Sequence, residues 1–375
     1  MNNIFDYLKV QGFRGLKSLE LSDLGKVNIF VGDNNSGKTS LLEAISIFCN
    51  PLDAFQWLGA SQRRSYVGGK HLETRPDLET VKWISLQEEK IDFIDEPYQG
   101  EITIEAKGTT PIIKLDVKLS AIEGIGEISN SKRFSDDDIS NKYVESGIEL
   151  EVIAHLVKPN PDLFGDSDLF KKTYYFWETE RFIQRKRYTP YIKNATIFPA
   201  YSESESILYR LTEIIKEGDG KEEVIQVLRL FDKNITDIEI LSTPKNRAIL
   251  SVNHQILGRT PLSVFGDGFK RALIIAITLM SIENGILLID EIETSIHVSA
   301  LSELFSWLVK TCQIRGIQLF VTTHSLEAVD AMLAAINNID DIVGFKLNKE
   351  GLPPQRFTGD ILDGLRERGL DVRGK

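Results

Sequence analysis

Eight residues between a short apolar segment and a helix carry the clearest chemistry in this chain. Residues 32–39 read Gly-Asp-Asn-Asn-Ser-Gly-Lys-Thr and have the spacing G-x-x-x-x-G-K-[ST] of a phosphate-binding P-loop. Residues 27–31 predict a buried strand before the loop, and residues 40–45 predict the start of a helix after it. Glycines let the backbone wrap around a polyphosphate, which backbone N–H groups and the positive helix end then bind. The sequence therefore predicts a nucleoside triphosphate site.

Individual side chains of this loop suit both the nucleotide and a metal ion. We expect Lys38 to reach the β- and γ-phosphates and the Thr39 hydroxyl to take one coordination position of Mg²⁺. The other residues expected to line the phosphates are Asn34, Asn35, Ser36, Gly37 and Ser40. The predicted cofactors are ATP and Mg²⁺.

A second apolar segment, residues 285–289, ends in the paired carboxylates Asp290 and Glu291, which is the Walker B arrangement. A buried parallel strand delivers its last residues to the carboxyl edge of a sheet, where ligands bind in open α/β folds. Asp290 is therefore expected to support the Mg²⁺ shell, and Glu291 to orient and deprotonate the attacking water. A buried strand that merely ends in an exposed acidic turn is the alternative, and the intact P-loop argues against it.

The next predicted core strand, residues 317–321, ends in Thr322-Thr323-His324-Ser325. A histidine at the end of the strand beside Walker B is placed to contact the γ-phosphate or the attacking water. We therefore predict a catalytic role for His324, although a lone histidine is more often structural.

A small Gly-rich turn opens the apolar helix predicted for residues 272–280. Such a turn makes a second helix N-terminus that suits a phosphate. Because one chain cannot easily close two such helix ends on one nucleotide, we expect two copies to pair around ATP. This turn, residues 263–268, is called the signature turn below, and its residues expected to contact ATP are Ser263, Gly266, Asp267 and Gly268.

Together these motifs resemble the ABC-type ATPases of the SMC and RecF kind, and more closely the AAA-15/AAA-21 ATPases of the OLD (overcoming lysogenisation defect) group. The closer resemblance rests on residues 11–15, 265–271 and 290–297. It implies that Arg14 approaches the phosphates, that the signature turn caps ATP across a dimer, and that residues 294–297 line the dimer seam. The Q-loop glutamine, a further metal ligand, stays open between Gln87, Gln56 and Gln62.

The predicted fold class is α/β: a P-loop NTPase of ABC ATPase type with a mixed central sheet, an antiparallel β lobe and a globular α+β insertion. Alternating apolar residues predict antiparallel strands at 101–106 and 112–119, and 3.6-residue periodicity predicts helices at 207–215 and 224–231. Residues 51–95 show no lasting period. The expected domains are a split core at 1–50 and 245–350, a β lobe with the Q-loop at 51–125, an insertion of strands then helices at 126–244, and a tail at 351–375.

Composition narrows the functional class. The chain has 375 residues, 42% hydrophobic and 26% charged, as is ordinary for a soluble protein. It has no apolar run of the roughly 18–20 residues that span a membrane. The two cysteines, Cys49 and Cys312, form no disulfide framework, which favours a cytoplasmic location.

The net charge of −11 argues against a protein coated in nucleic acid. One basic run with interleaved aromatic residues, at 181–188, could still grip phosphates while an aromatic ring stacks on a base. A solvated surface is the simpler interpretation of that run. Its cations are Arg181, Arg185, Lys186 and Arg187.

Several ABC subclasses fit the sequence poorly. Residues 40–262 hold strands and short helices rather than the heptads of an SMC arm. Residues 325–375 are too few for the Toprim nuclease domain that OLD proteins append, so we expect the ATPase half of a split system. The first functional hypothesis is a switch and scaffold that controls a separate nuclease or toxin in prokaryotic antiviral (phage) defence. The alternative is a RecF/SMC-like ATPase that acts directly on DNA.

Overall fold

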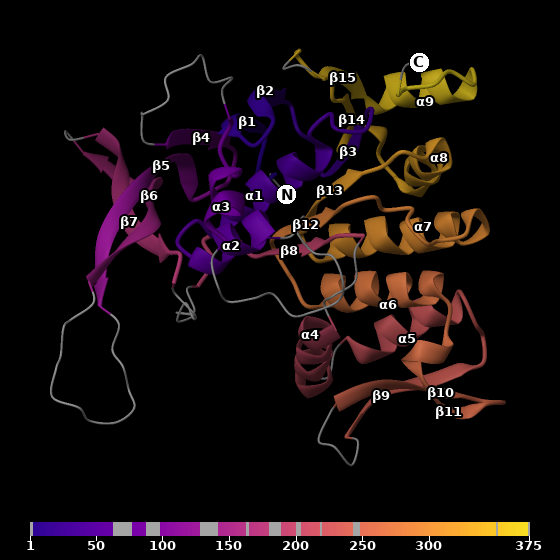
Figure 1. Cartoon of the computed structure of the whole chain (residues 1–375). Helices are drawn as coiled ribbons and strands as arrows, with labels where there is room; N and C mark the ends of the chain where they lie inside the picture. The colour runs from indigo at the N-terminus through magenta and orange to yellow at the C-terminus, as the bar shows by residue number, and fades with distance from the viewer. Residues whose placement is uncertain are drawn as a thin grey trace, which may run out of the picture.

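A mixed six-stranded sheet forms the centre of the computed structural model and positions the P-loop (Figure 1). Its spatial order is β15-β14-β3-β13-β12-β8, and all neighbours run parallel except β15, which is antiparallel to β14. The strands are β3 (Val27–Val31), β8 (Asn194–Ile197), β12 (Ile286–Ile289), β13 (Gln318–Thr322), β14 (Ile342–Lys346) and β15 (Gln355–Thr358). The structure describes residues 3–62, 77–87, 98–127, 142–162, 165–179, 189–199, 204–217, 220–242, 248–349 and 352–373.

A second, antiparallel sheet has the order β2-β1-β4-β5-β6-β7. Its outer strands form the lobe at the left of Figure 1. The strands are β1 (Tyr7–Phe13), β2 (Leu16–Ser22), β4 (Gln99–Lys107), β5 (Ile112–Glu127), β6 (Lys142–Asp162) and β7 (Gly165–Trp177). The predicted antiparallel lobe is confirmed.

Helix α1 (Lys38–Cys49) lies between the two sheets. Side chains alternate along each core strand, so Phe30 and Phe320 pack into the hydrophobic core around α1. Their neighbours Ile29 and Val321 face the opposite core, against the helices at the right of Figure 1. This burial of both sheet faces explains why the core strands read as continuous apolar runs rather than as alternating ones.

The helices of the second layer cover the other face of the core sheet, and a small sheet of order β11-β10-β9 lies beyond them (Figure 1). The helices of this layer are α4 (Ser204–Glu217), α5 (Lys221–Arg229), α6 (Asp267–Met280), α7 (Val298–Ile314), α8 (Leu326–Ala335) and α9 (Gly359–Glu367). The small strands are β9 (Ile235–Ser242), β10 (Ala248–His254) and β11 (Gly258–Pro261). Two 3₁₀ turns lie at Leu262–Val264 and Ile339–Asp341.

Three features differ from the sequence-based expectation. The segment expected to be irregular contains helices α2 (Ala54–Gln62) and α3 (Leu78–Lys82). Strand β8, inside the expected insertion, is an edge strand of the core sheet next to β12. The expected tail supplies β15 and α9, and β15 completes the other edge. The predicted domain ranges stay predictions.

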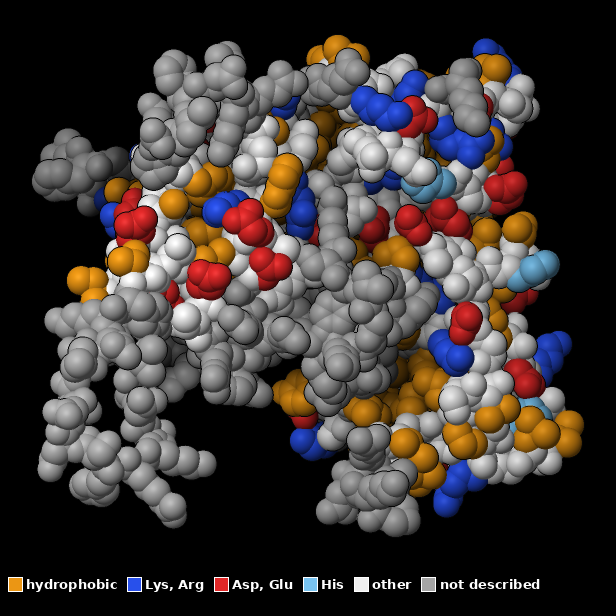
Figure 2. All heavy atoms as spheres, in the orientation of Figure 1, with side chains coloured by type: hydrophobic (Ala, Val, Ile, Leu, Met, Phe, Trp, Pro, Cys, Tyr) orange, Lys and Arg blue, Asp and Glu red, His pale blue; other side chains and the backbone are white. Residues whose placement is uncertain are grey.

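None of the helices in the described ranges is long and apolar enough to cross a membrane. Hydrophobic side chains gather at the lower right of Figure 2, over the region of α4 and β9–β11 in Figure 1. Ile256 and Leu257, in the turn between β10 and β11, are among the exposed large hydrophobic residues.

Candidate functional site

The P-loop leads from the end of β3 into the first turn of α1, as the motif predicts. Gly37 precedes the helix in a left-handed conformation (φ 91°), and a Cβ there would lie 2.4 Å from Leu16 Cδ2. Only glycine fits this position. No side chain caps the start of α1 within the described part of the chain. The N-terminus of the helix therefore has no side-chain cap, and its positive dipole end suits an anion.

Lys38 folds back over the mouth of this loop. Its Nζ donates to the carbonyl oxygens of Gly32 at 2.9 Å and Asp33 at 2.8 Å. Burial lowers the pKa of Lys38 from its ordinary value of 10.5, and the nearby carboxylates, Asp290 first among them, partly oppose this shift. A buried cation whose charge is costly gains when phosphate oxygens approach it.

The P-loop and Walker B meet directly at Asp290. Thr39 Oγ1 donates to Asp290 Oδ2 at 2.9 Å, and Thr322 Oγ1 donates to Asp290 Oδ1 at 2.5 Å. Thr39 follows β3 and Asp290 follows β12, the two strands that flank β13, so the parallel sheet brings a hydroxyl and a carboxylate together at its carboxyl edge. A hydroxyl and one carboxylate suit Mg²⁺, which takes few protein ligands beside phosphate oxygens and water.

Two further observations bear on whether the loop fits a nucleotide and its metal. The Ser36 hydroxyl is buried and has no hydrogen-bond partner among the described residues, so it can hydrogen-bond to a phosphate oxygen. The described residues form no cluster of three or more His, Cys, Asp or Glu side chains that could hold a metal by themselves. The donor set thus fits a cation held jointly by protein and nucleotide. The exposed Asn34 and Asn35 lie in the same loop.

Glu291 follows Asp290 in an unusual backbone conformation, with φ of 46°. Its N–H donates to Thr322 Oγ1 at 2.8 Å, and its Oε2 accepts from Thr294 Oγ1 at 3.1 Å. A non-glycine residue in the left-handed region is costly and is found often at functional sites. The Thr322 hydroxyl therefore holds both Walker B acids: it contacts the carboxylate of Asp290 and the backbone N–H of Glu291.

Arg271 is a site residue to which the sequence assigned no role. Its guanidinium is fully buried in α6, and it donates to the carbonyls of Phe198 at 2.9 Å, Asp290 at 2.8 Å and Glu291 at 3.2 Å. The contacts join the helix after the signature turn to the end of the Walker B strand. The sequence signal was an arginine directly before the apolar segment 272–280.

The loop of His324 is fixed by Glu293, which the sequence also missed. Glu293 Oε1 accepts the backbone N–H of His324 at 2.8 Å, and Oε2 accepts Thr323 Oγ1 at 2.7 Å. The half-buried His324 stands at the carboxyl end of β13, beside the Walker B strand as predicted. The sequence signal for Glu293 was the presence of a second acid two residues beyond Glu291, in the loop that faces the Thr322-Thr323-His324 turn.

The signature turn lies on the opposite layer from α1, at the start of α6. Ser263, Gly266 and Asp267 are exposed, whereas Gly268 packs so closely that a Cβ would lie 2.6 Å from the Ser295 carbonyl oxygen. The structure thus brings the signature turn against residues 294–297, the predicted seam.

Arg14 and Gln87 meet in a pocket of about 470 Å³ that Trp83 also lines. Arg14 pairs with Glu43 of α1 at 2.8 Å and donates to the Ala60 carbonyl. Gln87 donates to the carbonyls of Lys82 and Ser85. The predicted phosphate role of Arg14 and the predicted metal role of Gln87 stay predictions.

Two other predicted features stand apart from this site. The alternative Q-loop residues both lie in α2, where Gln56 accepts from Ser46 at 3.4 Å and Gln62 is buried. The basic run with Arg181, Arg185, Lys186 and Arg187 lies outside the described residues.

A P-loop, Walker B, a signature turn and a histidine on this core sheet define an ABC-type ATPase of the kind found in SMC and RecF proteins. The chain belongs to the family described as "AAA domain, putative AbiEii toxin, Type IV TA system", which matches residues 27–330. The family membership confirms the predicted AAA-21 resemblance.

The similarity to individual proteins reaches beyond the motif residues. An "ATP/GTP phosphatase" of Helicobacter pylori is 23% identical over 381 aligned residues, 95% of this chain and 96% of that protein. The "DNA replication and repair protein RecF" of Clostridium kluyveri is 28% identical over 136 residues, 36% of this chain and 32% of RecF. A solved SMC head bound to the C-winged helix domain of ScpA is 13% identical, covers 94% of this chain and 97% of its own, and has a TM-score of 0.48.

Proposed function

We propose that this ATPase is a nucleotide-driven switch, in which two copies close around ATP and Mg²⁺ and hydrolysis lets them separate. Thr39 and Asp290 would hold Mg²⁺, and Lys38 would leave the carbonyls of its own loop for the β- and γ-phosphates. Glu291 would take the proton of the attacking water, and His324 would contact the γ-phosphate or that water.

The observation that carries this proposal is the position of the signature turn. Its exposed residues open α6, on the opposite face of the core sheet from the P-loop helix α1. We infer that the N-terminal ends of α1 and α6 each bind phosphate oxygens and that, within one chain, they do not serve the same nucleotide. Val264, exposed beside this turn, adds apolar surface for a second copy to cover.

We further propose that the switch controls a separate effector, a nuclease or toxin, in prokaryotic antiviral defence. The family description, which refers to a toxin of a toxin–antitoxin system, supports a link to an effector. The RecF relatives support the second candidate, an ATPase that acts directly on DNA. The net charge of −11 favours the first.

One experiment separates the two candidates. The Glu291→Gln protein, held in ATP and Mg²⁺, is recovered with its natural neighbour proteins from cells, with and without nuclease treatment, and Lys38→Ala serves as the nucleotide-free control. A stoichiometric protein partner that depends on ATP and survives nuclease treatment supports the effector switch. Recovery of nucleic acid alone, with binding that weakens steeply with salt, supports the DNA-directed role.

A further inference from the structure

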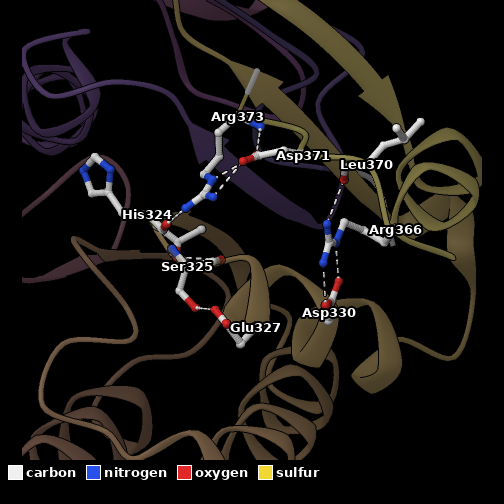
Figure 3. A network of polar contacts seen from close by, with 9 residues as sticks. His324, Ser325, Glu327, Asp330, Arg366, Leu370, Asp371 and Arg373 are labelled. Atoms are coloured by element: carbon white, nitrogen blue, oxygen red, sulfur yellow. Dashed lines mark hydrogen bonds and ion pairs between the residues drawn. The ribbon is translucent and has the colours of Figure 1, made fainter. Parts of the chain in front are cut away.

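Arg373 reaches from the segment after α9 to the loop that carries His324 (Figure 3). Its Nη1 donates to the backbone carbonyl of His324 at 2.6 Å. The same guanidinium makes a two-point contact with Asp371, Nε to Oδ1 at 2.9 Å and Nη2 to Oδ2 at 2.7 Å. This fork holds the guanidinium in one orientation, because both groups are planar.

His324 is consequently held at both of its backbone polar groups. Glu293 accepts its N–H at 2.8 Å, and Arg373 donates to its carbonyl. The N–H belongs to the peptide plane before the Cα atom and the carbonyl to the plane after it. Two charge-assisted hydrogen bonds therefore fix both planes and, with them, the direction in which the imidazole leaves the backbone.

The segment that carries Arg373 is itself anchored. Val372 is buried in the hydrophobic core of the helical layer. Arg366 of α9 makes a fork with Asp330 of α8, at 2.6 and 2.9 Å, and donates to the Leu370 carbonyl at 2.7 Å (Figure 3). The segment thus bridges α9, α8 and the loop that precedes α8.

We propose that Arg373, oriented by Asp371, is a positioning residue for His324, and that releasing residues 370–373 slows ATP hydrolysis without weakening ATP binding. The proposal rests on the proposed role of His324 at the γ-phosphate or the attacking water. None of the described contacts of Arg373 involves the P-loop, so ATP binding is left intact. The hydrogen bonds from Arg373 hold the pKa of Asp371 at about 2, so that carboxylate stays charged at neutral pH.

Steady-state hydrolysis and ATP affinity of the full chain test this inference. Arg373→Ala is expected to lower kcat about 10-fold while the ATP dissociation constant stays within about twofold, as suits a small misplacement of a reacting group. Asp371→Asn is expected to have a smaller effect in the same direction, and Arg373→Lys to restore part of the rate. The matched control is Arg368→Ala, which removes one exposed cation from the same segment.

The histidine ring itself gives a readout that does not depend on activity. The chain has only five histidines, so ¹³C-labelled imidazole signals can be assigned with His324→Ala. We expect Arg373→Ala and Asp371→Asn to move the His324 signal and Arg368→Ala to leave it in place. If Arg373→Ala unfolds the protein, Asp371→Asn and Arg373→Lys carry the same test.

The failures of the two proposals are distinguishable. Wild-type kcat and an unmoved His324 signal in Arg373→Ala, beside slow turnover in His324→Ala, overturn the positioning role and leave the role of His324 standing. Wild-type turnover in His324→Ala overturns the role of His324 itself.

Discussion

The guanidinium of Arg271 donates to the backbone carbonyl of Glu291 at 3.2 Å and also to that of Asp290 at 2.8 Å. Arg271 lies one turn into the helix that the signature turn opens, and Glu291 is the proposed general base. A displacement of the signature helix would therefore be transmitted to the backbone of Walker B through one buried, rigid side chain. This contact is a physical route by which pairing of two copies and hydrolysis could influence each other.

Arg271→Met tests that contact. The substitution keeps most of the apolar volume but removes the Arg271 donor from the buried Asp290 carbonyl and from the partly buried carbonyls of Phe198 and Glu291. We expect a loss of about 3 kcal/mol of unfolding free energy, since each buried unpaired acceptor costs about 1–3 kcal/mol. Denaturant unfolding measures it, with Arg368→Met, at an exposed position, as control. Equal stability of the two variants would contradict the structural role assigned to Arg271.

Glu291→Gln is expected to bind ATP normally and to hydrolyse it at least ~10²-fold more slowly, because an amide cannot accept the proton of the attacking water. Thr294 can still donate to the amide oxygen, so the loop is expected to keep its conformation. Phosphate release measures turnover, and the exposed Glu303→Gln is the control. Turnover like that of wild type would remove Glu291 from the role of general base.

Lys38→Ala is expected to abolish measurable nucleotide binding, since it removes the buried cation that lies over the mouth of the P-loop. The buried Lys38 is already desolvated, so the gain from phosphate contact is large. Titration with a fluorescent ATP analogue measures affinity, and Lys17→Ala, on an exposed position of β2, controls for the lost charge. ATP binding at wild-type affinity in Lys38→Ala would exclude this loop as the nucleotide site.

The lowered pKa of Lys38 predicts a pH dependence of ATP affinity. Burial favours the neutral amine, so its cost to folding is full at low pH and is relieved as pH rises towards 10.5. Bound phosphates favour the ammonium. Once the pH exceeds the lowered pKa of Lys38, ATP binding must be accompanied by uptake of a proton by the amine. ATP affinity then falls by up to about tenfold per pH unit. Lys38→Arg stays charged and is therefore expected to lack this fall in ATP affinity. If ATP affinity falls equally with pH in the wild type and in Lys38→Arg, a group other than Lys38 causes the pH dependence.

Local motifs and long-range contacts differed in how well the sequence predicted them. The P-loop, Walker B and the antiparallel strands could be predicted because each is encoded within about ten residues by spacing or alternation. Strand β8 could not be predicted as a strand of the core sheet, because its four residues are recognisable as such only from their pairing with β12, which is distant in the sequence. The same holds for Glu293 and Arg373, whose contacts with the His324 backbone join loops distant in sequence. The role of Arg271 could not be predicted either, because the sequence does not show that its side chain lies on the buried face of α6.

The two signature glycines allow a test of pairing that leaves the single chain intact. Gly266 has φ of −64°, and nothing lies within 4 Å of where a Cβ would be, so the monomer tolerates alanine there. Gly268 is different, because a Cβ would meet the Ser295 carbonyl at 2.6 Å and strain the fold. In the Glu291→Gln background with ATP and Mg²⁺, we expect a dimer by sedimentation. Gly266→Ala is expected to weaken it about 10-fold, since an added methyl would hold the partner's phosphates away from the N–H groups of α6. Unchanged thermal stability of Gly266→Ala would show that the loss arises between copies rather than within one. A protein that stays monomeric even with Gly266 intact would contradict pairing around ATP.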